Sequence, residues 1–335
     1  MAKNQNLTIV DLAKLTGYSK STISRVLTNN PKVKQSTRDK ILSYMEKENF
    51  LPNSLASSLA TGSTKIISLL VSDIRNAFFS EITWSIHNYC LKHDYFLVIF
   101  NTEYSPQKER YFLQLSQQWR FAGVIFISAV DSDKLNDVSV PLVLVNRTFS
   151  NFLGNSVTID NYRGGAMAAE HLIDYGHKDI GAITGPTQST ASMDRIKGFL
   201  DALRKSNIKI REEIFSEGNL TYEAGYNFGR KVAQLESKPT ALFAGNDQMA
   251  LGIMSALNRF TDNSRTKEIS IVGFDNIPFA DETLGNLTTV ENPQEELARL
   301  SVDILINSIK NPSMPVAKIV LEPKLIVRGS SVRIK

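Results

Sequence analysis

The side chains best suited to chemistry in this sequence are carboxylates and amides that stand just after short apolar runs. Asp73 follows the apolar run 66–71, Asn246 follows 241–244, and Asp275 follows 271–274. Their oxygens and N–H groups form hydrogen bonds with the hydroxyl groups of a polar ligand. This chemistry favours the binding of a polar small molecule.

Other residues extend the candidate site. Asp160 ends the run 157–159, and Arg147 follows the run 142–145. Aromatic side chains at Phe78, Phe79 and Tyr222 would supply a flat apolar wall. Polar groups combined with aromatic faces match a sugar, whose hydroxyls surround an apolar ring face.

Nothing in the sequence indicates catalysis or metal binding. Cys90 is the single cysteine, and His87, His93, His171 and His177 lack metal-ligand spacing. There is no nucleophile elbow and no phosphate-binding glycine loop. We therefore expect no enzymatic activity, no metal and no cofactor.

A second set of donors lies near the start of the chain. The pattern predicts one helix from about residue 9, a turn at Gly17, and a second helix over 19–28 that begins with Ser19. The outer face of this second helix carries Lys20, Ser21, Ser24 and Arg25. Such donors contact phosphates and base edges in a major groove. The alternative is an ordinary surface helical hairpin, in which these residues are only solvated.

The distribution of charge favours nucleic-acid binding. Residues 1–62 carry nine basic and four acidic side chains, whereas the remainder carries 29 basic and 30 acidic ones. A basic segment attached to a nearly neutral body is typical of a nucleic-acid-binding module. The region lacks the large exposed apolar face that a membrane-surface helix requires.

Length and composition bound the remaining possibilities. The chain has 335 residues, of which 42% are hydrophobic and 21% charged, so we expect a globular protein of two or three domains. No apolar stretch resembles a signal peptide or a membrane span. We expect an intracellular, cytoplasmic protein without membrane contact.

From Lys65 onward the sequence alternates between buried strands and amphipathic helices. Two such blocks predict two α/β lobes with parallel sheets, and ligands bind beyond the carboxyl ends of such strands. Strands are expected at 66–71, 96–100, 123–127, 142–145, 157–159, 180–183, 241–244 and 269–272, and helices at 79–92, 109–118, 164–175, 194–205, 222–235 and 248–260.

The segment between the two regions has two interpretations. Ser36 to Asp39 are expected to open a third helix with cap-type residues. Residues 54–62 are rich in small residues and end in Gly62, which fits a flexible linker. They also fit a marginally stable helix that forms only when it packs against a binding partner.

The N-terminal motifs resemble the DNA-binding head of the lactose/galactose repressor (LacI/GalR) family. The resemblance lies in DLAKLTGYSKSTISRVL at 11–27, STRDKIL at 36–42 and PNSLASSLA at 52–60. It implies that the last segment is a hinge helix, with Leu59 wedged into the minor groove. The predicted DNA-contacting residues are Thr8, Ser19, Lys20, Ser21, Thr22, Ser24, Arg25, Asn29, Lys34, Asn53, Ala56 and Leu59.

The later motifs are similar to the effector-binding core of the same family, in the family's order. They are VTIDNYRGG at 157–165, GP at 185–186 with DRIKGF at 194–199, GNDQMALG at 245–252, VGFDNIP at 272–278 and LTTV at 287–290. The resemblance implies a fold of the periplasmic-binding-protein type. It adds Ser192 and Arg195 to the predicted effector contacts. The neutral loop 187–191 favours a carbohydrate over a purine.

These observations predict a homodimeric, ligand-responsive repressor of carbohydrate-utilisation genes that binds a near-palindromic double-stranded operator. Predicted domains are a helix-turn-helix at 1–50, a hinge or linker at 51–63, and an effector-binding core at 64–335. Within the core, lobe 1 spans about 64–161 and 293–323, and lobe 2 spans about 162–292 and 324–335.

Three alternatives stay open at this point: a solute-binding transport protein, a purine- or nucleoside-responsive repressor of the same family, and a sugar-processing enzyme with an appended regulatory head. The basic N-terminal segment argues against the transport protein. The identity of the effector, the direction of its effect and the choice between dimer and tetramer also stay open.

Overall fold

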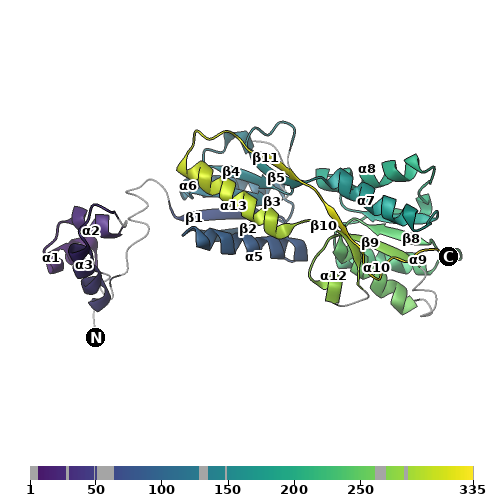
Figure 1. Cartoon of the computed structure of the whole chain (residues 1–335), viewed down its shortest axis with the longest axis horizontal. Helices are drawn as coiled ribbons and strands as arrows, with labels where there is room; N and C mark the ends of the chain where they lie inside the picture. The colour runs from purple at the N-terminus through teal and green to yellow at the C-terminus, as the bar shows by residue number, and fades with distance from the viewer. Residues whose placement is uncertain are drawn as a thin grey trace. The chain divides into compact units, whose positions relative to one another are not determined.

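The computed structural model describes residues 7–27, 30–48, 50, 64–127, 135–147, 149–260, 269–282 and 286–334. The chain divides into two compact units, which we call the head (Met1–Lys65) and the core (Ile66–Lys335) (Figure 1). The predicted hinge, including Asn53, Ala56 and Leu59, lies outside the described residues, as does Asn29.

The head is a bundle of three helices: α1 (Ile9–Thr16), α2 (Lys20–Leu27) and α3 (Gln35–Lys47). Each helix contributes one fully buried side chain to the centre of the bundle, namely Leu12, Ile23 and Ile41. The chain turns between α1 and α2 at Gly17, whose φ of 74° lies in the left-handed region that glycine tolerates best. The predicted helix-turn-helix is confirmed.

Local capping explains where the head helices begin. Thr8 and Asp11 form a reciprocal capping box at the start of α1. The Oγ of Ser19 accepts a hydrogen bond from the backbone N–H of Thr22 (3.2 Å), as expected for the residue that opens α2. The expected cap at Ser36 is wrong, because α3 begins one residue earlier and Lys34 precedes it without a side-chain cap.

Lobe 1 of the core is a six-stranded parallel sheet in the order β11-β5-β4-β3-β1-β2. Its strands are β1 (Ile66–Val71), β2 (Phe96–Asn101), β3 (Gly123–Ile127), β4 (Leu142–Val145), β5 (Asn155–Ile159) and β11 (Lys318–Leu321). Its helices are α5 (Ala77–Lys92), α6 (Pro106–Gln118) and α13 (Gln294–Lys310), with a short 3₁₀ turn at Leu135–Asp137. Strands β3 and β4 are buried along their whole length, as expected for sheets covered on both faces.

Lobe 2 repeats this arrangement with the order β12-β10-β9-β8-β6-β7, in which only β12 runs antiparallel to its neighbour. Its strands are β6 (Ile180–Thr184), β7 (Phe215–Glu217), β8 (Ala241–Ala244), β9 (Ser270–Asp275), β10 (Thr288–Glu291) and β12 (Lys324–Ile326). Its helices are α7 (Asn161–Asp174), α8 (Thr190–Lys205), α9 (Tyr222–Ala233), α10 (Asp247–Phe260) and α12 (Phe279–Glu282), with a 3₁₀ turn at Glu212–Ile214. The predicted fold class, a helical head with two α/β lobes, is confirmed.

The chain passes between the lobes three times. It leaves lobe 1 after β5, returns after β10, and crosses again between β11 and β12 (Figure 1). Helix α13 follows β10 in sequence but packs in lobe 1 against α5 and strands β3, β4 and β5. Three connections therefore join the two lobes.

Among the described residues, no helix is both long enough and apolar enough to span a membrane.

Candidate functional site

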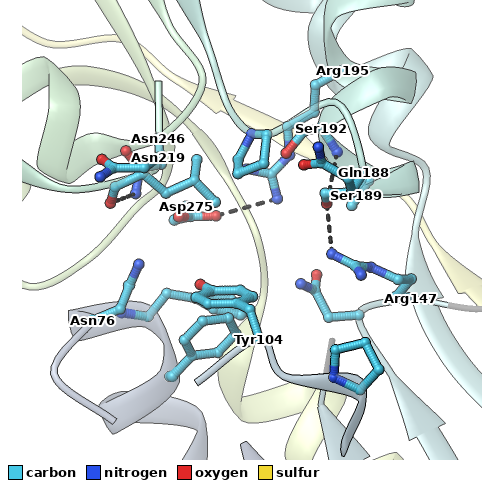
Figure 2. Close-up of a pocket in the computed structure, with 17 residues that line it drawn as sticks. Asn76, Tyr104, Arg147, Gln188, Ser189, Ser192, Arg195, Asn219, Asn246 and Asp275 are labelled. Carbon is cyan, nitrogen blue, oxygen red and sulfur yellow. Dashed lines mark hydrogen bonds and ion pairs between the residues drawn. The ribbon is translucent and has the colours of Figure 1, made fainter. Parts of the chain in front are cut away.

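A cavity of about 450 Å³ is formed in the core by residues of both lobes. That volume lies within the usual range for small-molecule sites. Figure 2 shows side chains from the two lobes pointing toward one another across it. Seven of the predicted effector contacts line the cavity: Phe78, Phe79, Arg147, Ser192, Arg195, Asn246 and Asp275.

Arg195 is held on lobe 2 by three acceptors and an aromatic ring. Its Nε donates to Asn161 Oδ1 (2.7 Å) and its Nη1 donates to the carbonyl oxygen of Gly245 (2.9 Å). Its Nη2 lies 3.5 Å from Asp275 Oδ1, and the guanidinium stacks over Phe274 at 3.7 Å from the ring centroid. Burial lowers the pKa of Arg195, against the pull of Asp275 and Asp247. The guanidinium is therefore fixed in place before any ligand contact is made.

Asp275 occupies a strained backbone position at the end of β9. Its φ is 114°, which lies in the region that favours glycine. Its Oδ1 also accepts a hydrogen bond from Asn292 Nδ2 (3.4 Å). Burial raises the pKa of Asp275 to about 6, while Arg195 and the hydrogen bond from Asn292 act in the opposite direction. Backbone strain of this kind persists where surrounding structure enforces it, and it clusters at functional sites.

Arg147 connects the lobes across the cavity. It follows β4 in lobe 1, and its Nη2 donates to Ser189 Oγ (2.7 Å) in lobe 2 (Figure 2). Burial lowers the pKa of Arg147 to about 10, although the carboxylate of Glu109 opposes that shift. The neighbouring Asn146 also takes part in a cross-lobe link, since its Oδ1 accepts from Asn292 Nδ2 (3.2 Å).

An aromatic surface forms one side of the cavity. Phe78 and Phe79, both in the first turn of α5, pack edge to face with ring centroids 5.3 Å apart. Tyr104 lies beside them among the lining residues, and burial raises its pKa to about 12. These rings offer an apolar face opposite the polar groups of lobe 2.

Three predicted effector contacts are not among the lining residues, and each has another role. Asp73 accepts hydrogen bonds from the side chain of Arg75 (2.9 Å) at the end of β1. Asp160 caps α7 by accepting from the backbone of Arg163 (2.8 Å). Tyr222 is 45% exposed on α9 and stacks with Tyr226.

Several polar residues that line the cavity were not among the predicted effector contacts. These residues are Asn76, Tyr104, Asn146, Gln188, Ser189 and Asn219. Two of them carried a usable signal, since Asn146 stands at a strand end and Ser189 has the residue type of a helix cap.

The head presents the expected donor face. Lys20, Ser21, Ser24 and Arg25 on α2 are all exposed, whereas Ile23 on the same helix is fully buried. Among the other predicted contacts, Thr8, Ser19 and Lys34 are exposed and Thr22 is half-buried. This face of α2 therefore points away from the small hydrophobic centre of the head.

Comparison with known families assigns both units. Residues 8–53 match the family described as bacterial regulatory proteins of the lacI family, and residues 169–331 match a periplasmic binding protein-like domain. A match of the head to a regulatory family favours a regulator over the transport protein considered above.

Sequence relatives match nearly the whole chain, and a solved structure matches most of it. The ribose operon repressor of Escherichia coli strain K12 is 30% identical over 331 residues, covering 97% of this chain and 99% of the relative. The HTH-type transcriptional repressor PurR of Vibrio parahaemolyticus is 29% identical, with coverage of 96% and 98%. A LacI family transcriptional regulator from Enterococcus faecium, solved with bound ribose, is 26% identical with a TM-score of 0.71, covering 81% of this chain and 100% of that one. The predicted family resemblance is confirmed, and the chain belongs to the lacI family of bacterial regulatory proteins.

Proposed function

We propose that this chain is a sequence-specific DNA-binding transcriptional repressor whose affinity for its operator is controlled by a carbohydrate bound in the core cavity. One observation carries the proposal. The same chain joins an exposed donor face on a helix-turn-helix head to a two-lobed cavity that combines fixed polar groups with an aromatic wall.

The lining of the cavity supports a carbohydrate ligand. Gln188 and Asn219 line it with exposed amides, each of which both donates and accepts hydrogen bonds, as sugar hydroxyls do. Phe78 and Phe79 suit the apolar face of a sugar ring. One relative is named for the ribose operon, and one structural neighbour was solved with ribose, which adds support for a small sugar.

In the head, α2 would lie in the major groove. Arg25 is the best candidate to read a guanine, because its fork matches the O6 and N7 acceptors. Lys20 and Ser21 would set the operator preference, and Lys34 would contact phosphate. A single short helix reads few bases, so we propose a homodimer whose two heads bind a near-palindromic site.

The two sites would communicate through the movement of the lobes. The two lobes would adopt two relative positions. A ligand that contacts both lobes favours the position to which it binds more tightly, and its difference in affinity sets the size of the shift. The hinge predicted at 51–63 would transmit this preference to the heads. We further propose that the cavity binds its ligand without transforming it, as relatives named as repressors suggest.

Two linked experiments test this function. First, the full-length protein is used to select duplexes from a random library at physiological ionic strength, and preferred sequences are compared with random competitor. Second, sugars and nucleobases are screened by thermal shift, and each compound that binds is added to the operator titration. An operator affinity that changes with a sugar supports the proposal. Absence of any preferred duplex overturns it, and a response to nucleobases alone overturns the carbohydrate assignment.

A further inference from the structure

We infer that the cavity is built for an uncharged ligand, so that the effector is a free sugar and its phosphorylated or carboxylate derivatives are excluded. This inference rests on the proposed function and specifies the class of sugar. It depends on the partners of the charged side chains that line the cavity, and on the way the surrounding helices begin.

The lining residues include three charged side chains, and the protein already provides partners for them. Arg195 faces Asp275 at 3.5 Å and donates to two further protein oxygens, so its charge is balanced within lobe 2. Arg147 donates to Ser189 Oγ, and the buried carboxylate of Glu109 interacts electrostatically with it. An anionic ligand would have to disrupt one of these arrangements.

Helix N-termini are the other common source of anion binding, because their first N–H groups lack partners within the helix. Five helices have a lining residue of the cavity at or directly before their first turn, as expected at the carboxyl ends of parallel strands, whereas α13, which has no side-chain cap, contributes no lining residue. A side-chain oxygen caps each of the five. The capping atoms are Asn76 Oδ1 for α5, Ser105 Oγ for α6, Ser189 Oγ for α8, Thr221 Oγ1 for α9 and Asn246 Oδ1 for α10.

Ser189 both caps a helix and binds one of the charged side chains. Its Oγ accepts from the backbone N–H of Ser192 (3.3 Å) at the start of α8, and also from Arg147 Nη2 (2.7 Å). One neutral hydroxyl thus occupies the position where a phosphate would find both a helix N-terminus and a guanidinium. Helix α6 adds Pro106 at its first position, where the backbone has no N–H to offer.

The polar groups that remain for a ligand are mostly neutral. Asn219 and Gln188 are exposed at the edge of the cavity, and their amides carry acceptors as well as donors. A hydroxyl satisfies such groups in either direction, whereas a phosphate or carboxylate only accepts. Burying an anion here would cost its hydration, and the described lining residues offer no uncompensated cation in return.

The test uses matched pairs of ligands on the full-length protein. Thermal shift and calorimetry compare ribose, glucose and fructose with ribose 5-phosphate, glucose 6-phosphate, fructose 1-phosphate and gluconate. We expect every charged compound to bind at least about tenfold more weakly than its neutral parent. A charged compound that binds as tightly as its parent overturns the inference. A neutral nucleobase that binds while no sugar does would overturn the carbohydrate assignment but support an uncharged ligand.

Variants give an independent readout. Glu109→Gln removes the carboxylate near Arg147, and Ser189→Ala removes the shared acceptor, so both should reduce the discrimination against charged compounds. Glu103→Gln is the control, since it removes the same charge from an exposed pair with Lys108 (2.7 Å) nearby. Unchanged discrimination in both test variants would contradict the inference.

Inorganic phosphate serves as a probe that does not depend on knowing the sugar. At millimolar concentration and constant ionic strength, it should not stabilise the core of the wild-type protein through the cavity. A phosphate-dependent rise in melting temperature that Arg147→Gln abolishes would reveal an anion site and overturn the inference. A rise that persists in Arg147→Gln would come from elsewhere, such as the basic head, and would leave the cavity without an anion site.

Discussion

Gly165 of α7 packs directly against the backbone of Arg195 in α8. A Cβ atom at Gly165 would overlap the carbonyl oxygen of Arg195, so only glycine allows the two helices to approach this closely. The same α7–α8 contact is repeated where Gly198 meets the backbone of Tyr162. The position of the Arg195 guanidinium in the cavity therefore depends on having glycine, which has no side chain, at position 165 of α7.

Gly165→Ala tests this dependence. Alanine favours a helix over glycine by about 1 kcal/mol, but overlap with backbone cannot be relieved by a rotamer change and should cost about 1–3 kcal/mol or more. We expect a net loss of stability in denaturant titrations and a weaker calorimetric affinity for the effector. Gly229→Ala is the control, because it crowds the α9–α10 contact at Ala256 and Ile253 instead. Unchanged effector affinity in Gly165→Ala would contradict the proposed link.

Removing either partner of the buried ion pair should have different consequences. Arg195→Met leaves the carboxylate of Asp275 buried without its cation, which typically costs about 3–5 kcal/mol. Asp275→Asn keeps the size of the side chain and should retain the fold while weakening effector binding. Urea unfolding and calorimetry on both variants measure these effects. An Asp275→Asn protein that binds with wild-type affinity would move the ligand away from this residue.

The titration of Asp275 predicts how stability and binding change with pH. Burial raises the pKa of Asp275 from 3.8 to about 6, so the folded state holds this proton more strongly than the unfolded state does. The stabilisation from this group is fully present below about pH 3.8 and is lost as the pH rises through about 6. The wild type should therefore lose stability relative to Asp275→Asn across that interval.

Effector affinity should change in the opposite direction over the same interval. The ionised carboxylate pairs with Arg195 and accepts hydrogen bonds from hydroxyls, so binding should strengthen as the pH rises toward and above about 6. Calorimetric titrations at a series of pH values measure this, with Asp275→Asn as the comparison. A wild-type affinity that is flat across the interval would show that ionised Asp275 is not required.

Arg25→Ala tests the proposed reading of bases by α2. We expect a loss of about 1–3 kcal/mol in binding to the selected operator, together with relaxed preference at one base position. Lys34→Ala is the comparison, since a lost phosphate contact weakens binding to all sequences and reduces the salt dependence. Fluorescence anisotropy on specific and random duplexes separates the two results. An equal loss on every sequence for Arg25→Ala would reassign it as a phosphate contact.

Leu59→Ala tests the wedge that the family resemblance implies for the hinge. Loss of the apolar wedge should reduce operator bending without changing affinity for the effector. Circular-permutation gels measure the bend, and calorimetry measures the effector. Bending equal to that of the wild type would remove Leu59 from this role.

Much of this architecture follows from local patterns in the sequence. The helix-turn-helix was predictable because Gly17, Ser19 and the spacing of Leu12 and Ile23 each specify structure within a few residues. Strands such as β3 and β4 are continuous apolar runs, and the parallel order of the sheets follows from their alternation with helices. Polar residues at strand ends pointed to the cavity for the same reason.

Helix α13, with strands β11 and β12, was not identified from sequence patterns, since the partner that buries each of them is distant in the chain. Position after an apolar run could not by itself separate Asp275 from Asp73 or Asp160, and only the family resemblance ranked Asp275 above Asp160. Asp275 meets Arg195 across about eighty residues of sequence, whereas Asp73 binds a residue two positions away and Asp160 caps the helix it precedes.

The sequence by itself determined the family and most of the helices and strands, because those depend on neighbours along the chain. Only the tertiary structure decided which polar side chains face the cavity and which charges are already balanced there. Which side chains face the cavity depends on packing between elements that are far apart in sequence. Gly165 of α7 allows Arg195 of α8 to pair with Asp275, and Arg147 of lobe 1 donates to Ser189 of lobe 2.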